Sequence, residues 1–169
     1  MQRPDNPSMP HRKKNDKSDE TPAGRLAETG LQGILGYQLA QARLTTDEVF
    51  LQSAGRRFDL RPVDFTLLAL LDHNPGVSAR QLARALAVTP PNLTTWLEQL
   101  ERRGLIARER SAADRRTQPV VLTAAGATLA REAAAAIIAN ETATLDNLSA
   151  AERALLIELL HKVAARRPR

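Results

Sequence analysis

The sequence contains no cysteine, and this single absence removes several classes of protein. Disulfide scaffolds, cysteine-based zinc sites, iron–sulfur clusters and thiol redox sensors all need that side chain. No apolar run reaches the roughly eighteen residues of a membrane span, so we expect no membrane partner. The first residues lack the apolar segment of a secretory signal, which predicts a cytoplasmic protein.

Residues that carry catalysis or bind metals are also scarce. Aromatic residues make up 3% of the chain, and the three histidines, His11, His73 and His161, form no spaced pair of ligands. No glycine-rich phosphate loop, nucleophile elbow or pair of catalytic carboxylates is recognisable. We therefore expect neither an enzyme nor a metal or cofactor site.

The charge of the chain is unevenly distributed. The formal net charge is +5, and residues 78–119 hold eight Lys or Arg against four Asp or Glu. Such a segment indicates either a polyanion site or a solvated face, and charge alone leaves both interpretations open. Residues 1–25 contain four of the ten prolines and a polar run from 11 to 20, which predicts a disordered tail.

Apolar spacing predicts a mainly helical chain. A helix is expected from about Leu31 to residue 55. Thr45–Glu48 could instead cap a new helix, so the sequence leaves open whether this helix is broken there. Pro62 suits the first position of a short helix that Asn74-Pro75-Gly76 stops. Capping boxes at Ser78–Gln81 and Ser149–Glu152, and Thr123 as an N-cap, predict three further helix starts.

Residues 79–100 have the spacing of a helix-turn-helix. Small residues stand at Ala83 and Ala87, and Leu93 follows at the position that packs inward from the second helix. That helix, from Thr89 or Pro90 to Gly104, should bury Leu93, Leu100 and one of two neighbours, Trp96 or Leu97. Its outer face should carry short hydrogen-bonding side chains suited to base edges and phosphates: Thr89, Pro90, Asn92, Thr95 and Gln99.

After this helix the spacing of apolar residues changes from the helical period to that of β-strands. Leu105–Glu109 and Pro119–Leu122 predict a β-hairpin whose tip, Arg110–Gln118, is basic. A recognition helix followed directly by such a hairpin is the winged form of the helix-turn-helix. Two long helices, 124–147 and 150–165, complete the chain, and their wide apolar stripes predict a partner chain.

Residues from about 35 to 163 resemble the MarR/SlyA family of bacterial winged helix-turn-helix regulators. The resemblance rests on Leu35–Leu39, on Leu93–Ile106, on Asp114-Arg115-Arg116 and on Val121–Gly126. It implies a mainly α fold with a small hairpin, in which a winged lobe is joined to a helical dimerisation region. The expected parts are a tail (1–25), a dimerisation helix (26–60), the winged lobe (61–122, with the wing at 105–122) and dimerisation helices (123–169).

The resemblance implies a homodimer that binds a palindromic operator in double-stranded DNA, acts as a repressor and is released by a small aromatic or phenolic effector. In the wing, Arg116 would enter the minor groove, Asp114 would orient it, and Arg115 would contact the wing or phosphate. Ser78 and Thr94 join the residues expected to bind DNA. The dimer would be held by apolar residues of the first and last helices: Leu35, Leu39, Leu155, Leu156, Leu159, Leu160 and Val163.

Two further interpretations stay open. Tyr37, Phe58 and Phe65 are candidate walls of an effector pocket, although in a chain with so few aromatic residues each is better explained as a core residue. The alternative function is a helical dimeric adaptor whose winged domain binds protein. The arginines at the tip of the hairpin favour DNA over that alternative.

Overall fold

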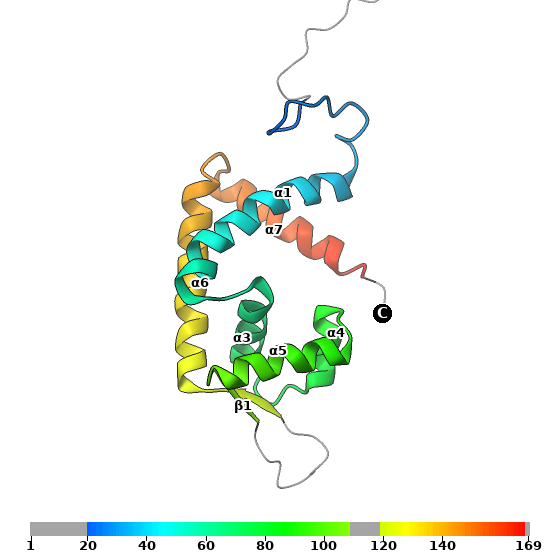
Figure 1. The fold of residues 1–169 in the computed structure, drawn as a ribbon. Helices are drawn as coiled ribbons and strands as arrows, with labels where there is room; N and C mark the ends of the chain where they lie inside the picture. Colours follow the sequence, from blue (N-terminus) through cyan, green and yellow to red (C-terminus); the bar gives the residue numbers. More distant parts are fainter. Residues whose placement is uncertain (1–19, 109–118, 168–169) are drawn as a thin grey trace, which may run out of the picture. The chain divides into compact units, whose positions relative to one another are not determined.

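The computed structural model describes residues 20–108 and 119–167, which fall into two compact units. The first unit ends at Leu44 and the second begins at Thr45, within helix α1 (Leu35–Phe50). Figure 1 traces the chain through both units. In the described residues, no helix combines the length and the apolar character that a membrane crossing requires.

The described structure starts inside the segment expected to be a disordered tail. Glu20 pairs with Ala27 in an isolated bridge, and Thr21 closes the turn by accepting a hydrogen bond from the Leu26 amide over 3.0 Å. The prediction therefore differs from the structure at residues 20–25, because Thr21 provides a local hydrogen bond that composition does not reveal. Residues 1–19 lie outside the described residues.

The first long helix begins four residues later than expected and continues through Thr45–Glu48 without a break. It passes into a π-helical turn, Leu51–Gly55, and then into the short helix α2 (Arg56–Phe58). The Val49 carbonyl accepts hydrogen bonds from the Ser53 hydroxyl (2.6 Å) and from the Asn140 amide (3.2 Å). These side-chain bonds satisfy a backbone carbonyl where the helical register changes.

The next three helices follow the predicted signals closely. Helix α3 runs Pro62–His73 with Pro62 as its first residue, and helix α4 runs Ala79–Leu86 behind the Ser78–Gln81 capping box. Helix α5 runs Pro90–Arg102, and Gly104 follows it with a φ of +68°. This left-handed residue lets the chain turn from α5 into the hairpin.

The expected hairpin is present as a two-stranded antiparallel sheet. Strand β1 (Ile106–Arg108) pairs with β2 (Val120–Leu122), and Ala107 faces Val121 in the register. Within the described part of the hairpin, each strand begins one residue later than expected, at Ile106 and at Val120. The segment between them, 109–118, contains the predicted wing tip and lies outside the described residues.

The last two helices begin at their predicted caps. The Thr123 hydroxyl accepts the Gly126 amide at the start of α6 (Ala124–Thr144), and Ser149 forms a capping box with Glu152 at the start of α7 (Ala150–Ala164). Arg153 joins the two helices by donating to the Glu141 carbonyl (2.7 Å) and to a hydroxyl oxygen of α6. Arg153 is therefore a structural residue of this corner.

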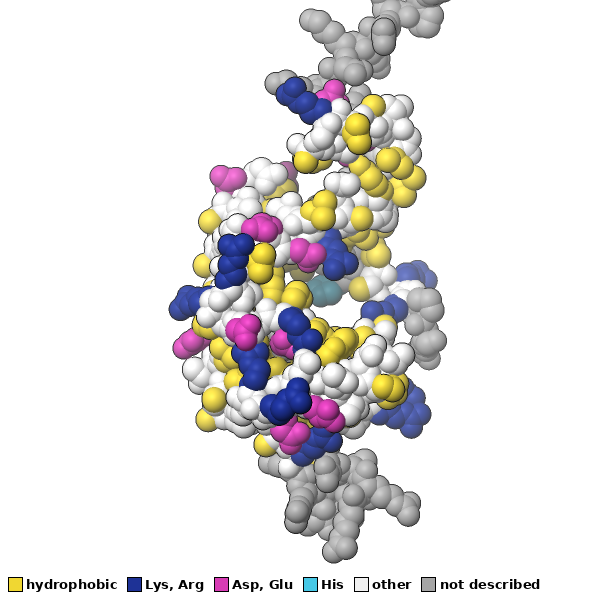
Figure 2. All heavy atoms as spheres, in the orientation of Figure 1, with side chains coloured by type: hydrophobic (Ala, Val, Ile, Leu, Met, Phe, Trp, Pro, Cys, Tyr) yellow, Lys and Arg dark blue, Asp and Glu magenta, His cyan; other side chains and the backbone are white. Residues whose placement is uncertain are grey.

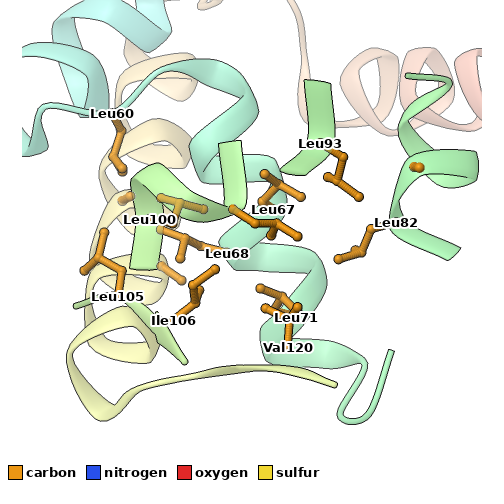
Figure 3. Close-up of a cluster of buried hydrophobic side chains, with 14 of the residues drawn as sticks. Leu60, Leu67, Leu68, Leu71, Leu82, Leu93, Leu100, Leu105, Ile106 and Val120 are labelled. Atoms are coloured by element: carbon orange, nitrogen blue, oxygen red, sulfur yellow. The ribbon is translucent and has the colours of Figure 1, made fainter. Parts of the chain in front are cut away.

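One hydrophobic core joins α3, α4, α5, the hairpin and the first half of α6 (Figure 3). Leu67, Leu68 and Leu100 are fully buried at its centre. Ala130 and Ala133 of α6 are also buried in this cluster. The core of the winged lobe therefore extends beyond residue 122, where the sequence placed the boundary with the dimerisation helices. Alanine allows this approach because its small side chain lets α6 pack closely.

Helix α7 buries none of its side chains within the single chain. Its apolar stripe keeps between 38% and 53% exposure at the following residues: Leu155, Leu156, Leu159, Leu160 and Val163. Ile138 of α6 is also 62% exposed. Figure 2 shows hydrophobic side chains gathered at the surface among the charged ones. Apolar stripes of this kind mark an interaction surface.

Candidate nucleic-acid interface

Helices α4 and α5 form the tight helix-turn-helix that the spacing predicted. Ala83 is 6% exposed, so the two helices cross closely at a small side chain. Ala87 adopts the left-handed conformation with a φ of +53°, and its amide donates back to the end of α4. Leu93 is 1% exposed and packs inward from α5. All three residues therefore occupy the places that the pattern assigned to them.

The faces of α5 are clearly divided. Leu93, Leu97 and Leu100 are buried, which resolves the choice between Trp96 and Leu97 in favour of Leu97. Trp96 is half-buried against the core. Thr89, Pro90, Asn92, Thr94 and Thr95 are exposed, as expected. Gln99 and Ser78 are half-buried, so Gln99 is less available than its place on the helix suggested, because it adjoins the corner before α3.

The exposed side chains of α5 offer a mixed hydrogen-bonding surface. The Thr94 and Thr95 hydroxyls donate to the carbonyls of Pro90 (3.0 Å) and Pro91 (3.2 Å), which leaves their oxygens as acceptors and their methyl groups as apolar contacts. Asn92 offers both a donor and an acceptor, the combination that matches adenine in the major groove. This face can therefore read base edges without a charged residue.

The two prolines alter the first turn of α5. A helix normally starts with free backbone N–H groups that bind phosphate, but Pro90 and Pro91 have none. The Leu93 amide is already bonded to the Thr89 carbonyl over 3.2 Å. Phosphate contacts at this end must therefore come mainly from side chains.

The hairpin is tied to the end of α5. Arg108 of β1 forms an ion pair with Glu101 of α5, with 3.2 Å between Nε and Oε2. The Thr123 hydroxyl donates to the Gly104 carbonyl over 2.8 Å. These contacts fix where the hairpin leaves the helix. Asp114, Arg115 and Arg116, the predicted wing residues, lie outside the described residues.

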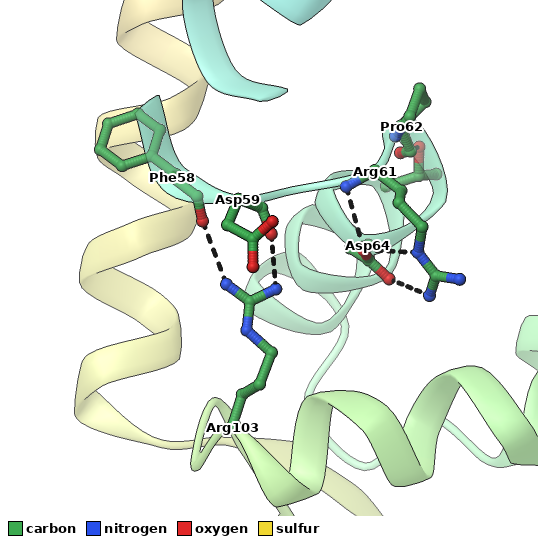
Figure 4. A network of polar contacts seen from close by, with 7 residues as sticks. Phe58, Asp59, Arg61, Pro62, Asp64 and Arg103 are labelled. Atoms are coloured by element: carbon green, nitrogen blue, oxygen red, sulfur yellow. Dashed lines mark hydrogen bonds and ion pairs between the residues drawn. The ribbon is translucent and has the colours of Figure 1, made fainter. Parts of the chain in front are cut away.

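A polar cluster joins the corner before α3 to the far end of α5 (Figure 4). Asp64 is 4% exposed and accepts hydrogen bonds from the Arg61 guanidinium at 2.6 and 2.8 Å and from the Arg61 amide at 3.0 Å. Burial by itself raises the pKa of Asp64, but the Arg61 hydrogen bonds and the Arg61 and Arg103 charges outweigh it and hold this pKa below 3.8. Asp64 therefore remains a carboxylate.

The aromatic residues named as pocket walls have other environments. Phe58 and Phe65 pack against the hydrophobic core, and Phe65 stacks at a tilt on Phe50 with ring centroids 6.2 Å apart. Tyr37 belongs to the first unit and donates to Glu28 over 2.7 Å, and this hydrogen bond raises the pKa of Tyr37. A groove of about 1190 Å³ is lined instead by α4, the first turn of α5 and Arg167.

The described residues contain no group of three or more His, Asp or Glu side chains placed to hold a metal ion. His73 is exposed, with Nδ1 3.8 Å from an Asp72 oxygen, and His161 lies on the exposed surface of α7. His11 lies outside the described residues.

Comparison with known proteins identifies this architecture. Residues 60–117 match the MarR family. The HTH-type transcriptional repressor Rv2887 of Mycobacterium tuberculosis is 35% identical over 102 residues, which cover 60% of this chain and 73% of the repressor. The chain belongs to the MarR family. The putative transcriptional regulatory protein for the hcr operon of Thauera aromatica is 28% identical over 152 residues, covering 90% of this chain and 92% of that protein.

Solved structures of MarR-family proteins have the same fold. The transcriptional repressor CouR, solved with a 23-mer DNA duplex, superposes with a TM-score of 0.75 and 34% identity over 82% of this chain and 98% of CouR. Rv2887, solved with p-aminosalicylic acid, superposes with a TM-score of 0.63 and 32% identity over 77% of this chain and 98% of that chain. This MarR-family chain is a DNA-binding transcriptional regulator with a winged helix-turn-helix. The MarR family is a family of transcriptional regulators.

Sequence reasoning missed three residues of this MarR-family lobe. Arg103 holds the corner after α2, and Arg108 pairs with Glu101 of α5. Asn140 donates to the Val49 carbonyl at the end of α1, just before the π-helical turn. Only Arg108 had a local signal, because it follows the recognition helix by a few residues. The partners of the other two are distant in sequence, so no periodicity reveals them.

Proposed function

We propose that this chain is a homodimeric repressor that reads a palindromic operator with α5 and the wing. The observation that supports this most directly is the division of α5. Three leucines anchor it in the core, and an exposed polar face follows a tight turn at Ala87. A helix held in this way presents its first turns to the major groove.

The roles proposed for single residues follow from their chemistry. Asn92, Thr94 and Thr95 would contact base edges, and Thr89, Pro90 and Gln99 would lie along the groove walls. Ser78, at the start of α4, would contact a phosphate. In the wing, Arg116 would enter the minor groove, with Asp114 orienting it and Arg115 beside it.

The dimer is proposed from the exposed stripe of α7 together with Leu35 and Leu39 of α1, which are 56% and 36% exposed. Pairing these surfaces would remove a large apolar area from water. A two-fold dimer places two recognition helices on half-sites about one helical turn apart, which requires a palindromic operator. Such a regulator would act in the cytoplasm, where bacterial chromosomal DNA lies.

A small aromatic acid is proposed as the effector that releases the operator. Structures of the relative Rv2887 contain salicylic acid or p-aminosalicylic acid, and one contains DNA. Phe58 and Phe65 of the winged lobe remain candidate contacts for such an acid. Tyr37, the third aromatic residue predicted for this role, belongs to the first unit. The side chains of Phe58 and Phe65 would have to leave part of their present packing against the hydrophobic core to contact the acid.

Selection of bound duplexes from a random library, followed by footprinting, tests this function. We expect two symmetric half-sites about 10 bp apart. Arg116→Ala should weaken binding by about 1–3 kcal/mol per half-site and lower the salt dependence. Asp114→Ala should have a smaller effect, because Asp114 only orients the arginine.

Arg56→Ala is the matched surface control, since Arg56 is exposed and lies outside the proposed interface. It should bind the selected duplex like the parent chain. Unchanged binding by Arg116→Ala would remove the wing from the proposal. Binding of the parent chain to proteins but to no duplex would favour the adaptor instead.

A further inference from the structure

Arg103 connects the recognition helix to a part of the lobe that is distant in sequence. Its guanidinium donates to the Asp59 carbonyl over 2.7 Å and to the Phe58 carbonyl over 3.0 Å. These carbonyls stand at the C-terminal end of α2, where Asp59 is left-handed with a φ of +51°. Helix ends leave such carbonyls without helical partners. Arg103 therefore caps α2 from another element (Figure 4).

The backbone fixes the direction in which Arg103 leaves α5. Its amide donates to the Gln99 carbonyl over 3.2 Å, and the Gly104 amide donates to Glu101 over 2.9 Å. The Gly104 carbonyl is held in turn by the Thr123 hydroxyl. The Arg103 side chain therefore links two fixed points. One is the end of α5, and the other is the Phe58–Asp59 corner, which leads directly into buried Leu60 and then into α3.

Arg103 directly follows the C-terminal end of α5, whereas the turns proposed to read bases start at its N-terminal end. Helix α5 has 13 residues, so about 18 Å separates Arg103 from the first turn at 1.5 Å per residue. A tilt of about five degrees at the Arg103 end would move that first turn by about 1.5 Å. Recognition groups need to be held within about 0.5 Å of their productive positions. A small loss of restraint at Arg103 therefore displaces Asn92, in the first turn, more than Thr95, which lies one turn nearer to Arg103.

We propose that Arg103 is a positioning residue for sequence discrimination: by holding the carbonyls of Phe58 and Asp59, it sets the tilt at which α5 presents its polar face to bases. This inference rests on the proposed DNA-reading role of α5. Phosphate contacts tolerate a small tilt because they involve flexible charged side chains, whereas hydrogen bonds to base edges do not. Arg103 thus acts on specific binding and leaves general affinity for DNA nearly unchanged.

The forked guanidinium group of Arg103 is essential to this role, because it holds two carbonyls at the same time. Arginine presents donors in a fixed plane and reaches two carbonyls at once, whereas lysine has a single ammonium group that acts as a point charge. Arg103→Met removes the donors and keeps most of the aliphatic stem. Arg103→Lys keeps the charge and loses the fork. Arg102→Met is the matched control, because it removes the same charge one residue earlier and Arg102 makes no hydrogen bond to the Phe58–Asp59 corner.

The experiment measures the dissociation constants of the full-length variants for two duplexes, one selected by the parent chain and one with the same bases shuffled. We expect Arg103→Met to weaken the selected duplex about tenfold and the shuffled duplex less than about twofold. Arg103→Lys should lose discrimination in the same direction. Arg102→Met should leave the ratio of the two constants at the parent value.

The ratio of the two dissociation constants separates a loss of helix positioning from simple destabilisation of the fold. Partial unfolding lowers the active fraction and weakens both duplexes by the same factor, so it leaves the ratio unchanged. An equal loss on both duplexes in Arg103→Met would overturn the inference, because partial unfolding or a lost phosphate contact produces it and a loss of positioning does not. If Arg103→Met does not fold, full discrimination by Arg103→Lys would overturn it. A parent chain that binds both duplexes equally would refute the proposed function itself.

Discussion

Gly126, in the first turn of α6, lies against the backbone of Leu105, the residue that opens the hairpin after α5. A Cβ atom on Gly126 would stand 1.9 Å from the Leu105 carbonyl oxygen. The Thr123 hydroxyl, which caps α6 by accepting the Gly126 amide over 3.0 Å, also donates to Gly104. The start of α6 and the end of the recognition helix are therefore locked together by a close backbone approach and a shared hydroxyl.

Gly126→Ala should destabilise the fold by about 1–3 kcal/mol, because the added methyl group forces the backbone of α6 or of the hairpin to move. Urea unfolding followed by circular dichroism measures this change. Gly36→Ala on α1 is the control, since a Cβ atom added there would meet no atom within 4 Å. The control should be neutral or slightly stabilising. Equal stability of Gly126→Ala and the parent would refute the close approach.

Ala87→Gly should stabilise the lobe by up to about 1 kcal/mol. Ala87 has a φ of +53°, a conformation that glycine adopts without a steric penalty. Ala85→Gly, two residues earlier within α4, is the matched control and should destabilise by about 0.5–1 kcal/mol. Thermal unfolding of the two variants should therefore move the melting temperature in opposite directions. A lower melting temperature for Ala87→Gly would contradict this explanation of the turn.

Asp64 should make the free energy of unfolding depend on pH in acidic solution. Because its pKa is lower in the folded chain than the ordinary 3.8, the carboxylate stabilises the fold above that value. This contribution is lost as the pH falls below about 3.8 through the folded pKa. Asp64→Asn should be about 1–2 kcal/mol less stable at pH 7, because Arg61 loses its charged partner.

The measurement is the free energy of unfolding of both proteins between pH 7 and pH 2. The difference between them should shrink below about pH 4, when the parent carboxylate becomes protonated. A difference that stays constant down to pH 2 would show that Asp64 has no lowered pKa.

Leu156→Glu and Leu159→Glu should each split the proposed dimer or reduce its stability steeply, because the charge would be buried between two copies of α7. Ala154→Glu is the control, since the helical period places Ala154 on the opposite side of the same helix. Sedimentation equilibrium should find a dimer for the parent and the control. A stable, folded monomer of the parent chain would contradict the proposed interface.

The sequence predicted those parts of the fold that depend on neighbouring residues. Ser78 and Ser149 form the expected capping boxes, Pro62 begins α3, and Ala87 occupies the turn between α4 and α5. Each of these features depends on residues within a few positions, so spacing alone reveals them. The division of α5 into a buried and an exposed face followed from the same helical period.

The features that sequence did not predict depend on distant contacts. The π-helical turn at Leu51–Gly55 is supported by Asn140, which lies 91 residues from its partner Val49. Arg103 reaches carbonyls 44 and 45 residues away. Gln99 is half-buried because of the corner that Arg103 holds, although its helical position alone placed it outside. Such contacts are set by tertiary packing, for which one sequence contains no local signal.

The most direct test of the DNA-reading role is the affinity of the parent chain for its selected duplex and for a shuffled duplex, measured by fluorescence anisotropy between about 50 and 200 mM salt. The logarithm of the association constant should fall linearly and steeply with the logarithm of salt for both duplexes. The selected duplex should bind at least about a thousandfold more tightly. Equal affinity for both duplexes, with little dependence on salt, would contradict the account.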